Sequence, residues 1–164
     1  MRLTEEHVTR KLSHALVKEG YQIVSIHPPD GQGPFVIRKP PIKDAIERSS
    51  YHPDIVAIST ENKPKLLIAE SKLNESDLGI DLAKLAEFSQ SRFAMLFSFF
   101  RCQKFDGGPK YGFDFDEIKN LDTVDLPIEF VLACSTEKKS EIEIFEINGF
   151  HTRLFRFNRN ELSI

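Results

Sequence analysis

The amino-acid sequence predicts a single α/β domain, residues 1–164, with a central mixed sheet flanked by helices and additional strands at the C-terminal end. Three observations lead to this prediction. The chain has 164 residues, 40% of them hydrophobic, which is enough for one compact core. Helical and strand-like hydrophobic periods follow one another along it. Fourteen Phe residues and no Trp, with many Ile, Leu and Val, favour a core that contains a sheet.

The first expected element is a helix over residues 3–20. Thr4 is a suitable N-cap, acidic residues follow it in the first turn, and Gly20 is a typical stop. At about 100° per residue, Glu5 falls at the edge of the apolar stripe and Glu6 points away from it. Glu5 is therefore expected to face the interior.

A strand and a hairpin are expected next. Residues 21–27 alternate like a strand, and the Gly- and Pro-rich residues 28–34 indicate a loop. Two strand-like runs, residues 54–59 and 65–72, flank the polar turn 60–64. These runs predict an antiparallel hairpin.

A second helix is expected over about residues 75–91, where Leu, Ala and Ile recur at helical spacing. The Phe-rich run 93–100 is expected to be a buried strand, and residues 101–125 to be irregular. The polar side of the second helix would carry Asp77, Asp81 and Lys84. Strand-like runs end the chain at residues 128–135, 141–147 and 152–157.

The hairpin is the part of the sequence that indicates chemistry. A turn centred near Asn62 pairs residues whose numbers sum to 124, which sets Asp54 opposite Glu70. Directly opposed residues have Cβ atoms about 4.5 to 5.5 Å apart, and Lys72 projects from the same face as Glu70. Two adjacent carboxylates repel unless positive charge compensates. Lys72 offsets part of this repulsion, and a Mg²⁺ ion with oxygen ligands would offset the rest.

Such a site suits phosphodiester hydrolysis, because a metal ion polarises a phosphoryl oxygen and lowers the pKa of a bound water. Lys72 would orient or activate the attacking water. Two roles remain open for it, a share in proton transfer and a purely electrostatic effect of its charge.

Pro53 and Asp54, followed after fifteen residues by Glu70, Ser71 and Lys72, resemble the PD-(D/E)xK motif of restriction-endonuclease-like nucleases. The resemblance covers about residues 4–100 and implies an αβββαβ core. It also implies Asp54, Glu70 and Lys72 as catalytic residues and Mg²⁺ as the cofactor, with Mn²⁺ as a substitute. The metal ligands that it implies are Asp54, Glu70, the main-chain carbonyl of Ser71, and Glu5 on the first helix.

The basic segment 35–50 is the candidate contact with nucleic acid. The net charge of −3 provides no global attraction to phosphates, so basic residues must gather locally or a partner must position the chain. A run of charges in a loop is also commonly just solvated. The nucleic-acid-binding candidates are Arg38, Lys39, Lys43 and Arg48.

The expected function is a Mg²⁺-dependent endonuclease, with DNA favoured over RNA as the substrate. One domain carries one site, so cutting both strands would need a homodimer or a partner protein subunit, as in a restriction or repair assembly. The alternative is a catalytically inactive subunit that keeps the fold and binds nucleic acid or acts as a scaffold.

Other classes of protein are disfavoured by composition. No apolar run approaches the roughly 20 residues that span a bilayer, and the charged N-terminus lacks the apolar stretch of a signal peptide. No membrane association and a cytoplasmic or nuclear location are therefore expected. Cys102 and Cys134 are too few for a disulfide framework or a zinc cluster.

Overall fold

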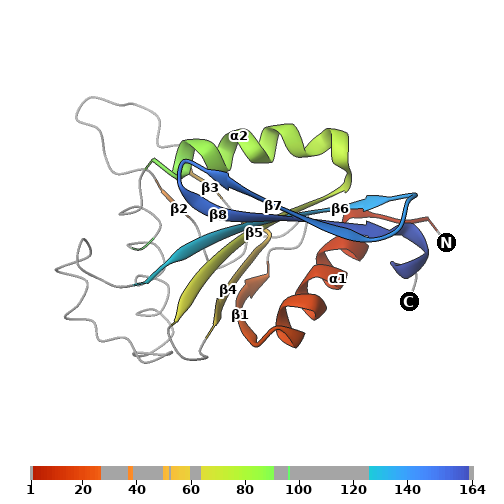
Figure 1. Cartoon of the computed structure of the whole chain (residues 1–164), viewed down its shortest axis with the longest axis horizontal. Coiled ribbons are helices and arrows are strands. Elements are labelled where there is room, and N and C mark those ends of the chain that lie inside the picture. Colours follow the sequence, from red (N-terminus) through yellow and green to blue (C-terminus); the bar gives the residue numbers. More distant parts are fainter. Residues whose placement is uncertain are drawn as a thin grey trace.

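The computed structural model describes residues 2–26, 37–38, 50–51, 53–59, 64–90, 96 and 126–162. Over these residues the chain forms a six-stranded mixed sheet between helix α1 (Glu5–Lys18) and helix α2 (Leu78–Phe88), which cover its opposite faces (Figure 1). The predicted α/β class is therefore confirmed. None of the described helices is long and apolar enough to cross a membrane.

The sheet combines an antiparallel half with a parallel centre. Strands β1, β4 and β5 are antiparallel neighbours, β6 and β8 continue parallel to β5, and β7 is the antiparallel edge strand. The connection from β5 to β6 includes α2, because parallel neighbours need a crossover. In spatial order the strands are β1 (Tyr21–Ile26), β4 (Ile55–Ser59), β5 (Lys65–Asn74), β6 (Ile128–Thr136), β8 (Phe150–Asn158) and β7 (Glu141–Ile147).

Four short elements complete the described part. Strands β2 (Ile37–Arg38) and β3 (Ser50–Tyr51) form a separate two-stranded ladder. The 3-10 turn η1 (Glu75–Asp77) leads from β5 into α2, and η3 (Arg159–Glu161) follows β8. The strand-like runs predicted at the C-terminal end correspond to β6, β7 and β8, with ends that differ by two residues at most.

Helix α1 begins as predicted. Its N-cap is Thr4, whose amide donates to Nδ1 of His7 at 3.1 Å while its hydroxyl lies 2.9 Å from the same nitrogen. The negative charges of Glu5 and Glu6 stabilise the first turn by interacting with the helix dipole. Gly20 follows the helix with φ of 97°, a conformation that suits glycine. The cap holds the turn that carries Glu5.

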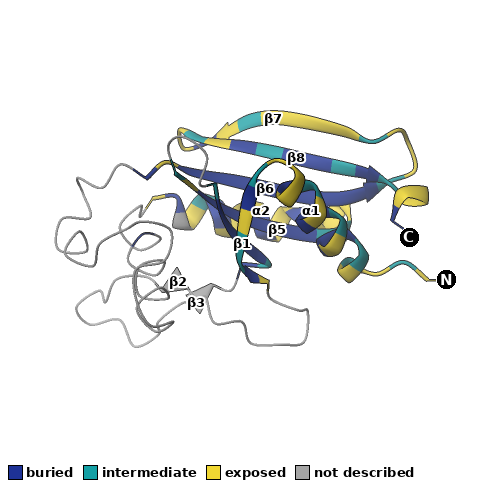
Figure 2. Cartoon of the chain, turned by 90° about the horizontal axis from the view of Figure 1, so that it is seen from below, coloured by how far each residue is buried: buried dark blue, intermediate teal, exposed yellow. Residues whose placement is uncertain are grey.

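Hydrophobic clusters pack against both faces of the sheet. Side chains alternate along a strand, so neighbouring residues of β5 enter different clusters. Leu67 and Ala69 pack with α1, whereas Leu66 and Ile68 pack with α2. Figure 2 shows the result as buried central strands beside a largely exposed edge strand β7. Asp54 directly precedes the buried stretch of β4, and Glu70 directly follows the buried apolar residues of β5.

The expectation of a strand over residues 93–100 is wrong at Leu96, the residue of this run that the structure describes. Leu96 is helical and fully buried in the cluster on the α2 side. A short apolar run without β-branched residues fits a buried helix as well as a strand, so periodicity alone does not separate them. On the side of β5 away from β4, the neighbouring strand is β6, which begins at Ile128.

Glu129 on β6 is a carboxylate inside the fold. It is 7% exposed, accepts a hydrogen bond from the Tyr21 hydroxyl, and lies 3.7 Å from the Arg153 guanidinium. Burial raises the pKa of the Glu129 carboxyl, and the positive charge of Arg153 offsets only part of this effect. The folded protein therefore binds the proton on Glu129 more tightly than the unfolded chain does.

Glu129→Gln is expected to reveal this difference in pKa. As the pH falls from 7.5 through the raised folded pKa, protonation favours the folded wild type, so wild type should gain stability relative to Glu129→Gln. Urea unfolding of both proteins across this range measures the gap, with Glu137→Gln as the control at an exposed site. A gap between wild type and Glu129→Gln that is the same at every pH would contradict the prediction.

Candidate functional site

The β4–β5 hairpin has the predicted register. Ser59 faces Lys65 and Ile58 faces Leu66, so the paired residue numbers sum to 124. The ladder ends at the pair Ile55 and Ala69, one residue before Asp54 and Glu70 are reached. Strand β5 then continues to its end without β4 beside it. The candidate residues therefore lie where β5 extends beyond its antiparallel neighbour.

Asp54 is held against β5 by Ser71. The Ser71 amide donates to Oδ2 of Asp54 at 2.8 Å, and the Ser71 hydroxyl lies 3.3 Å from the same oxygen. The hydroxyls of Ser71 and Thr9 are 2.5 Å apart, and Thr9 also donates to the main-chain oxygen of Glu5 at 3.1 Å. This chain of hydrogen bonds links the first turns of α1 to the carboxylate of Asp54 across β5.

Ser71→Ala is expected to lower the free energy of unfolding by about 1 kcal/mol, the usual net contribution of one hydrogen bond. The reason is that the buried Thr9 hydroxyl loses its contact with Ser71, while the amide bond to Asp54 remains. Urea denaturation measures the change, with Ser76→Ala in the exposed turn η1 as the control. Equal stability of Ser71→Ala and wild type would show that the hydroxyl pair contributes nothing.

Glu70 lies on β5 one residue past the end of the β4 ladder. It is 4% exposed and belongs, by alternation, to the face of β5 that packs with α2. Its charge acts on Lys72, two residues further along the same strand. The predicted common side of Glu70 and Lys72 is consistent with this placement.

A bulge in β5 sets the position of Lys72. Ser71 pairs with Ala133 and Asn74 pairs with Ser135. Between these two pairs, β5 contains one more residue than β6. Bulges of this kind redirect side chains and are frequent beside active sites. The ammonium of Lys72 lies 3.6 Å from Oε2 of Glu5. It lies 3.8 Å from Oδ2 of Asp81.

Lys72 therefore joins carboxylates from helices on opposite faces of the sheet. Glu5 is in the first turn of α1, and Asp81 is in the first turn of α2. The two helices can both reach Lys72 because β4 has ended beside this part of β5. The predicted inward orientation of Glu5 agrees with its 28% exposed side chain and its contact with Lys72.

The charges at this end of β5 influence one another. Burial raises the pKa of the Glu5 and Asp81 carboxyls, and Lys72 offsets part of the effect in both cases. Burial lowers the pKa of the Lys72 ammonium, but the surrounding carboxylates, Asp81 first among them, outweigh it and the pKa is raised. In this structure Lys72 is consequently a charged ammonium at neutral pH. Additional positive charge nearby would stabilise the ionised form of the carboxylates.

Asp81 corrects the prediction for the second helix. It was expected on the polar side of that helix, yet it is 3% exposed, and its Oδ2 has no hydrogen-bond partner within the described part of the chain. Asp81 lies three residues after Leu78 and four before Leu85, which are both buried. Helical phase therefore placed it on the inner side, and only its charge suggested the outer one. The contact of Thr9 with Ser71 had no comparable signal in the sequence.

The chemistry of the donors fits a hard cation, although the arrangement of their side chains is not that of a closed metal site. Carboxylate oxygens are the ligands that Mg²⁺ prefers, and the buried Oδ2 of Asp81 lacks a hydrogen bond among the described residues. Within the same residues, no group of three or more His, Cys, Asp or Glu side chains stands close enough to hold an ion together. The implied ligands Asp54, Glu70 and Glu5 each act on the charge of Lys72, but they do not form such a group.

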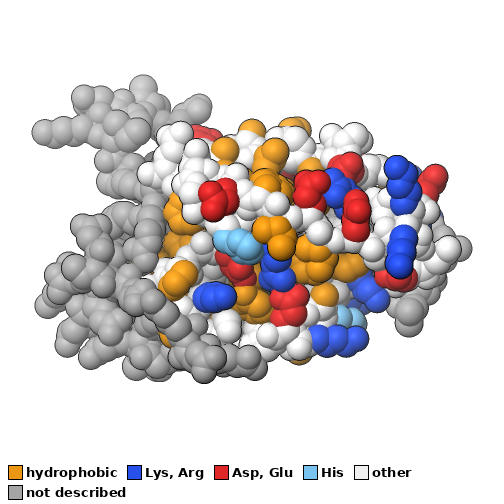
Figure 3. All heavy atoms as spheres, in the orientation of Figure 1, with side chains coloured by type: hydrophobic (Ala, Val, Ile, Leu, Met, Phe, Trp, Pro, Cys, Tyr) orange, Lys and Arg blue, Asp and Glu red, His pale blue; other side chains and the backbone are white. Residues whose placement is uncertain are grey.

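The basic candidates are not placed relative to this site. Lys39, Lys43 and Arg48 lie outside the described residues, and for Arg38 the structure describes only the backbone, in β2. On the face that Figure 3 shows, Lys and Arg side chains of the described part are dispersed among Asp and Glu. The described residues therefore form no separate basic patch on this face.

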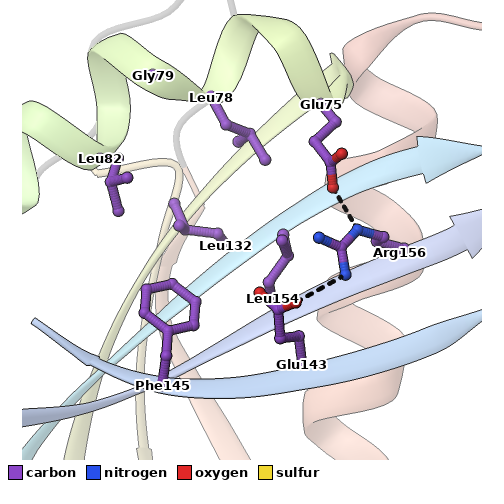
Figure 4. A pocket seen from close by; sticks show the side chains of 9 residues that line it. All are labelled: Glu75, Leu78, Gly79, Leu82, Leu132, Glu143, Phe145, Leu154 and Arg156. Atoms are coloured by element: carbon purple, nitrogen blue, oxygen red, sulfur yellow. Dashed lines mark hydrogen bonds and ion pairs between the residues drawn. The ribbon is translucent and has the colours of Figure 1, made fainter.

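A cavity of about 320 Å³ lies elsewhere on the α2 side of the sheet, between α2 and strands β6, β8 and β7 (Figure 4). Arg156 at its end forms ion pairs with Glu75, with Glu141 at 3.1 Å and with Glu143 at 3.7 Å. Because the cavity wall is apolar and the charge of Arg156 is already neutralised by these ion pairs, the cavity is not suited to bind a phosphate group. The apolar side chains of the wall are Leu78, Leu82, Leu132, Phe145 and Leu154.

No protein-family model matches the chain, and no curated protein sequence is significantly similar to it.

Proposed function

We propose that this protein is a Mg²⁺-dependent endonuclease that hydrolyses phosphodiester bonds of DNA, with a restriction-endonuclease-like core. The observation that carries the proposal is the position of Asp54, Glu70 and Lys72 at the end of the β4 ladder, with Glu5 brought to Lys72 by α1. Apart from the separate β2–β3 ladder and the turn η1, the elements follow the order α1, β1, β4, β5, α2, β6, which also supports the proposal because the implied core has the order αβββαβ.

Asp54, Glu70 and Glu5 would hold the ion in this proposal. Bound Mg²⁺ supplies a Lewis acid for the phosphoryl oxygen and lowers the pKa of a water molecule. Ser71 orients Asp54 by donating its amide to Oδ2, a bond that does not involve Oδ1. The hydrogen bonds from Ser71 to Asp54 thus hold one carboxylate in place before any cation binds.

Lys72 acts through its charge. Its ammonium lies 3.6 Å from a carboxylate oxygen of Glu5 and 3.8 Å from one of Asp81, and these contacts favour the charged form, so of the two roles considered for it the electrostatic one is proposed. A protonated ammonium can donate hydrogen bonds to a phosphate oxygen or to the attacking water but cannot accept a proton. Its function is to orient these groups and to stabilise negative charge that develops on the phosphate.

DNA and a protein partner complete the proposal. Arg38, Lys39, Lys43 and Arg48 are the candidate phosphate contacts, because a chain with net charge −3 needs a local basic surface to hold DNA. One domain supplies one cutting site, so a homodimer or a second subunit would cut the other strand.

The test is a cleavage assay with end-labelled duplex DNA, single-stranded DNA, branched DNA and RNA. We expect the purified protein to cut DNA when Mg²⁺ or Mn²⁺ is present, to stop when EDTA is added, and to resume when Mg²⁺ is restored in excess. Cleavage of RNA alone would correct the substrate class. Binding of these nucleic acids without cleavage under any of these conditions would contradict the proposal and support the non-catalytic subunit instead.

A further inference from the structure

We infer that Asp81 is a positioning residue for Lys72, which it holds at the end of β5 in the orientation needed for catalysis. The inference rests on the proposed function and adds to it a residue from α2 that the PD-(D/E)xK resemblance does not include. Its basis is the ion pair of 3.8 Å between Oδ2 of Asp81 and Nζ of Lys72, on a side chain that is almost wholly buried.

The buried position of Asp81 is unfavourable for the stability of the fold. Its place in α2 is in line with Leu78 and Leu85, which belong to the cluster on the α2 side of the sheet. A buried carboxylate without full hydrogen bonding destabilises a fold, and an apolar residue of similar size is commonly as good or better. Oδ2 of Asp81 lacks a hydrogen bond in the described part of the chain. Its ion pair there is with Lys72, and Lys84 adds a weaker attraction.

Lys72 needs a second anchor besides Glu5. The ammonium lies 3.6 Å from Glu5 and 3.8 Å from Asp81, so it is shared between two carboxylates at similar distances. Glu5 is also a candidate to hold a cation, and a carboxylate that does so interacts less strongly with a neighbouring ammonium. Asp81 is buried more deeply than Glu5, with 4% of its side chain exposed compared with 28%, so its attraction is less screened by water.

The elements that carry the pair also favour a positioning role. Lys72 leaves the sheet at the bulge of β5, where its backbone is not fixed by a regular ladder to β6. Asp81 belongs to a helix that the buried Leu78 and Leu85 fix against the sheet. A residue on a packed helix can therefore restrain a flexible lysine side chain at an irregular point of the strand.

The test compares Asp81→Asn and Asp81→Leu with wild type and with the control Asp77→Asn, an exposed position of η1 just before α2. We expect both Asp81 variants to lower kcat by roughly 10- to 100-fold, the loss typical of residues that orient a functional group, with little change in KM. In a Lys72→Ala background, Asp81→Asn should cause no further loss of kcat, because the residue to be positioned is absent.

A readout without metal or substrate accompanies the kinetics. The nuclear magnetic resonance signals of the Lys72 ammonium and its adjacent methylene, assigned by their loss in Lys72→Arg, should shift in Asp81→Asn and stay unchanged in Asp77→Asn. Asp81→Leu should unfold at a temperature equal to or above that of wild type while it still loses kcat, because it replaces a buried charge by an apolar side chain.

The outcomes separate the two claims. Wild-type cleavage together with unchanged kcat and unchanged Lys72 signals in Asp81→Asn would overturn the role of Asp81 and leave the proposed function standing. Parallel losses of kcat and unfolding temperature in both Asp81 variants, additive with Lys72→Ala, would also overturn it, because they indicate a structural residue. A wild-type protein that cuts no substrate refutes the proposed function itself, and the role of Asp81 with it.

Discussion

Lys72→Ala is expected to lower the kcat of Mg²⁺-dependent DNA cleavage by about 10²- to 10⁴-fold, the range for removal of a positioned catalytic group. The variant loses the ammonium that lies 3.6 Å from Glu5 and 3.8 Å from Asp81. Asp54→Asn should cause a loss of similar size, because it replaces the negative carboxylate held by Ser71 with a neutral amide. Single-turnover cleavage of labelled DNA measures both effects.

Lys139→Ala is the matched control for Lys72→Ala. Lys139 is an exposed lysine between β6 and β7, so the change removes the same charge from the protein at a distance from the candidate site. Its kcat should remain close to that of wild type. Cleavage by Lys72→Ala at the wild-type rate, with the same metal requirement, would remove Lys72 from the mechanism.

The second large effect concerns the sheet that supports the site. Phe130→Ala is expected to lower the free energy of unfolding by about 3 to 5 kcal/mol, as for other large-to-small changes at fully buried aromatic positions. Phe130 is 0% exposed on β6, beside β5, and its ring centroid lies 5.2 Å from that of Phe150. Urea denaturation measures the loss.

Ile144→Ala is the control for Phe130→Ala. Ile144 lies on the edge strand β7 and is 65% exposed, so its truncation should change stability by less than about 0.5 kcal/mol. Similar destabilisation by the two changes would mean that the cluster on the α2 side of the sheet is not the main source of stability. Loss of cleavage by Phe130→Ala only at temperatures where it unfolds would place its effect on the fold rather than on the chemistry.

Local patterns predicted a large part of the fold. The N-cap Thr4, the alternation of the strands and the register around Asn62 each depend on residues that are close in the sequence. The same register predicted Asp54 opposite Glu70, and in the structure the ladder stops one residue before this pair while β5 continues. For this reason the candidate site could be proposed before its surroundings were known.

Other features could not be derived in this way. The bulge that carries Lys72 arises because β5 has one more residue than β6 between two of their paired positions. It could not be predicted because β6 is far from β5 in the sequence. Leu96 was assigned to the wrong element because an apolar run is compatible with both a helix and a strand. Asp81 was assigned to the wrong side because its charge was weighed above its helical phase.

By itself, the sequence determined the α/β class and the register of the hairpin, and it predicted that Asp54, Glu70 and Lys72 gather there, since caps, turns and alternation act over short distances. Only the tertiary structure decided that Lys72 lies between Glu5 and Asp81. That contact arises because α1 and α2 pack on opposite faces of the sheet and both reach the part of β5 that β4 leaves open. Such packing depends on the whole core, which no local pattern encodes.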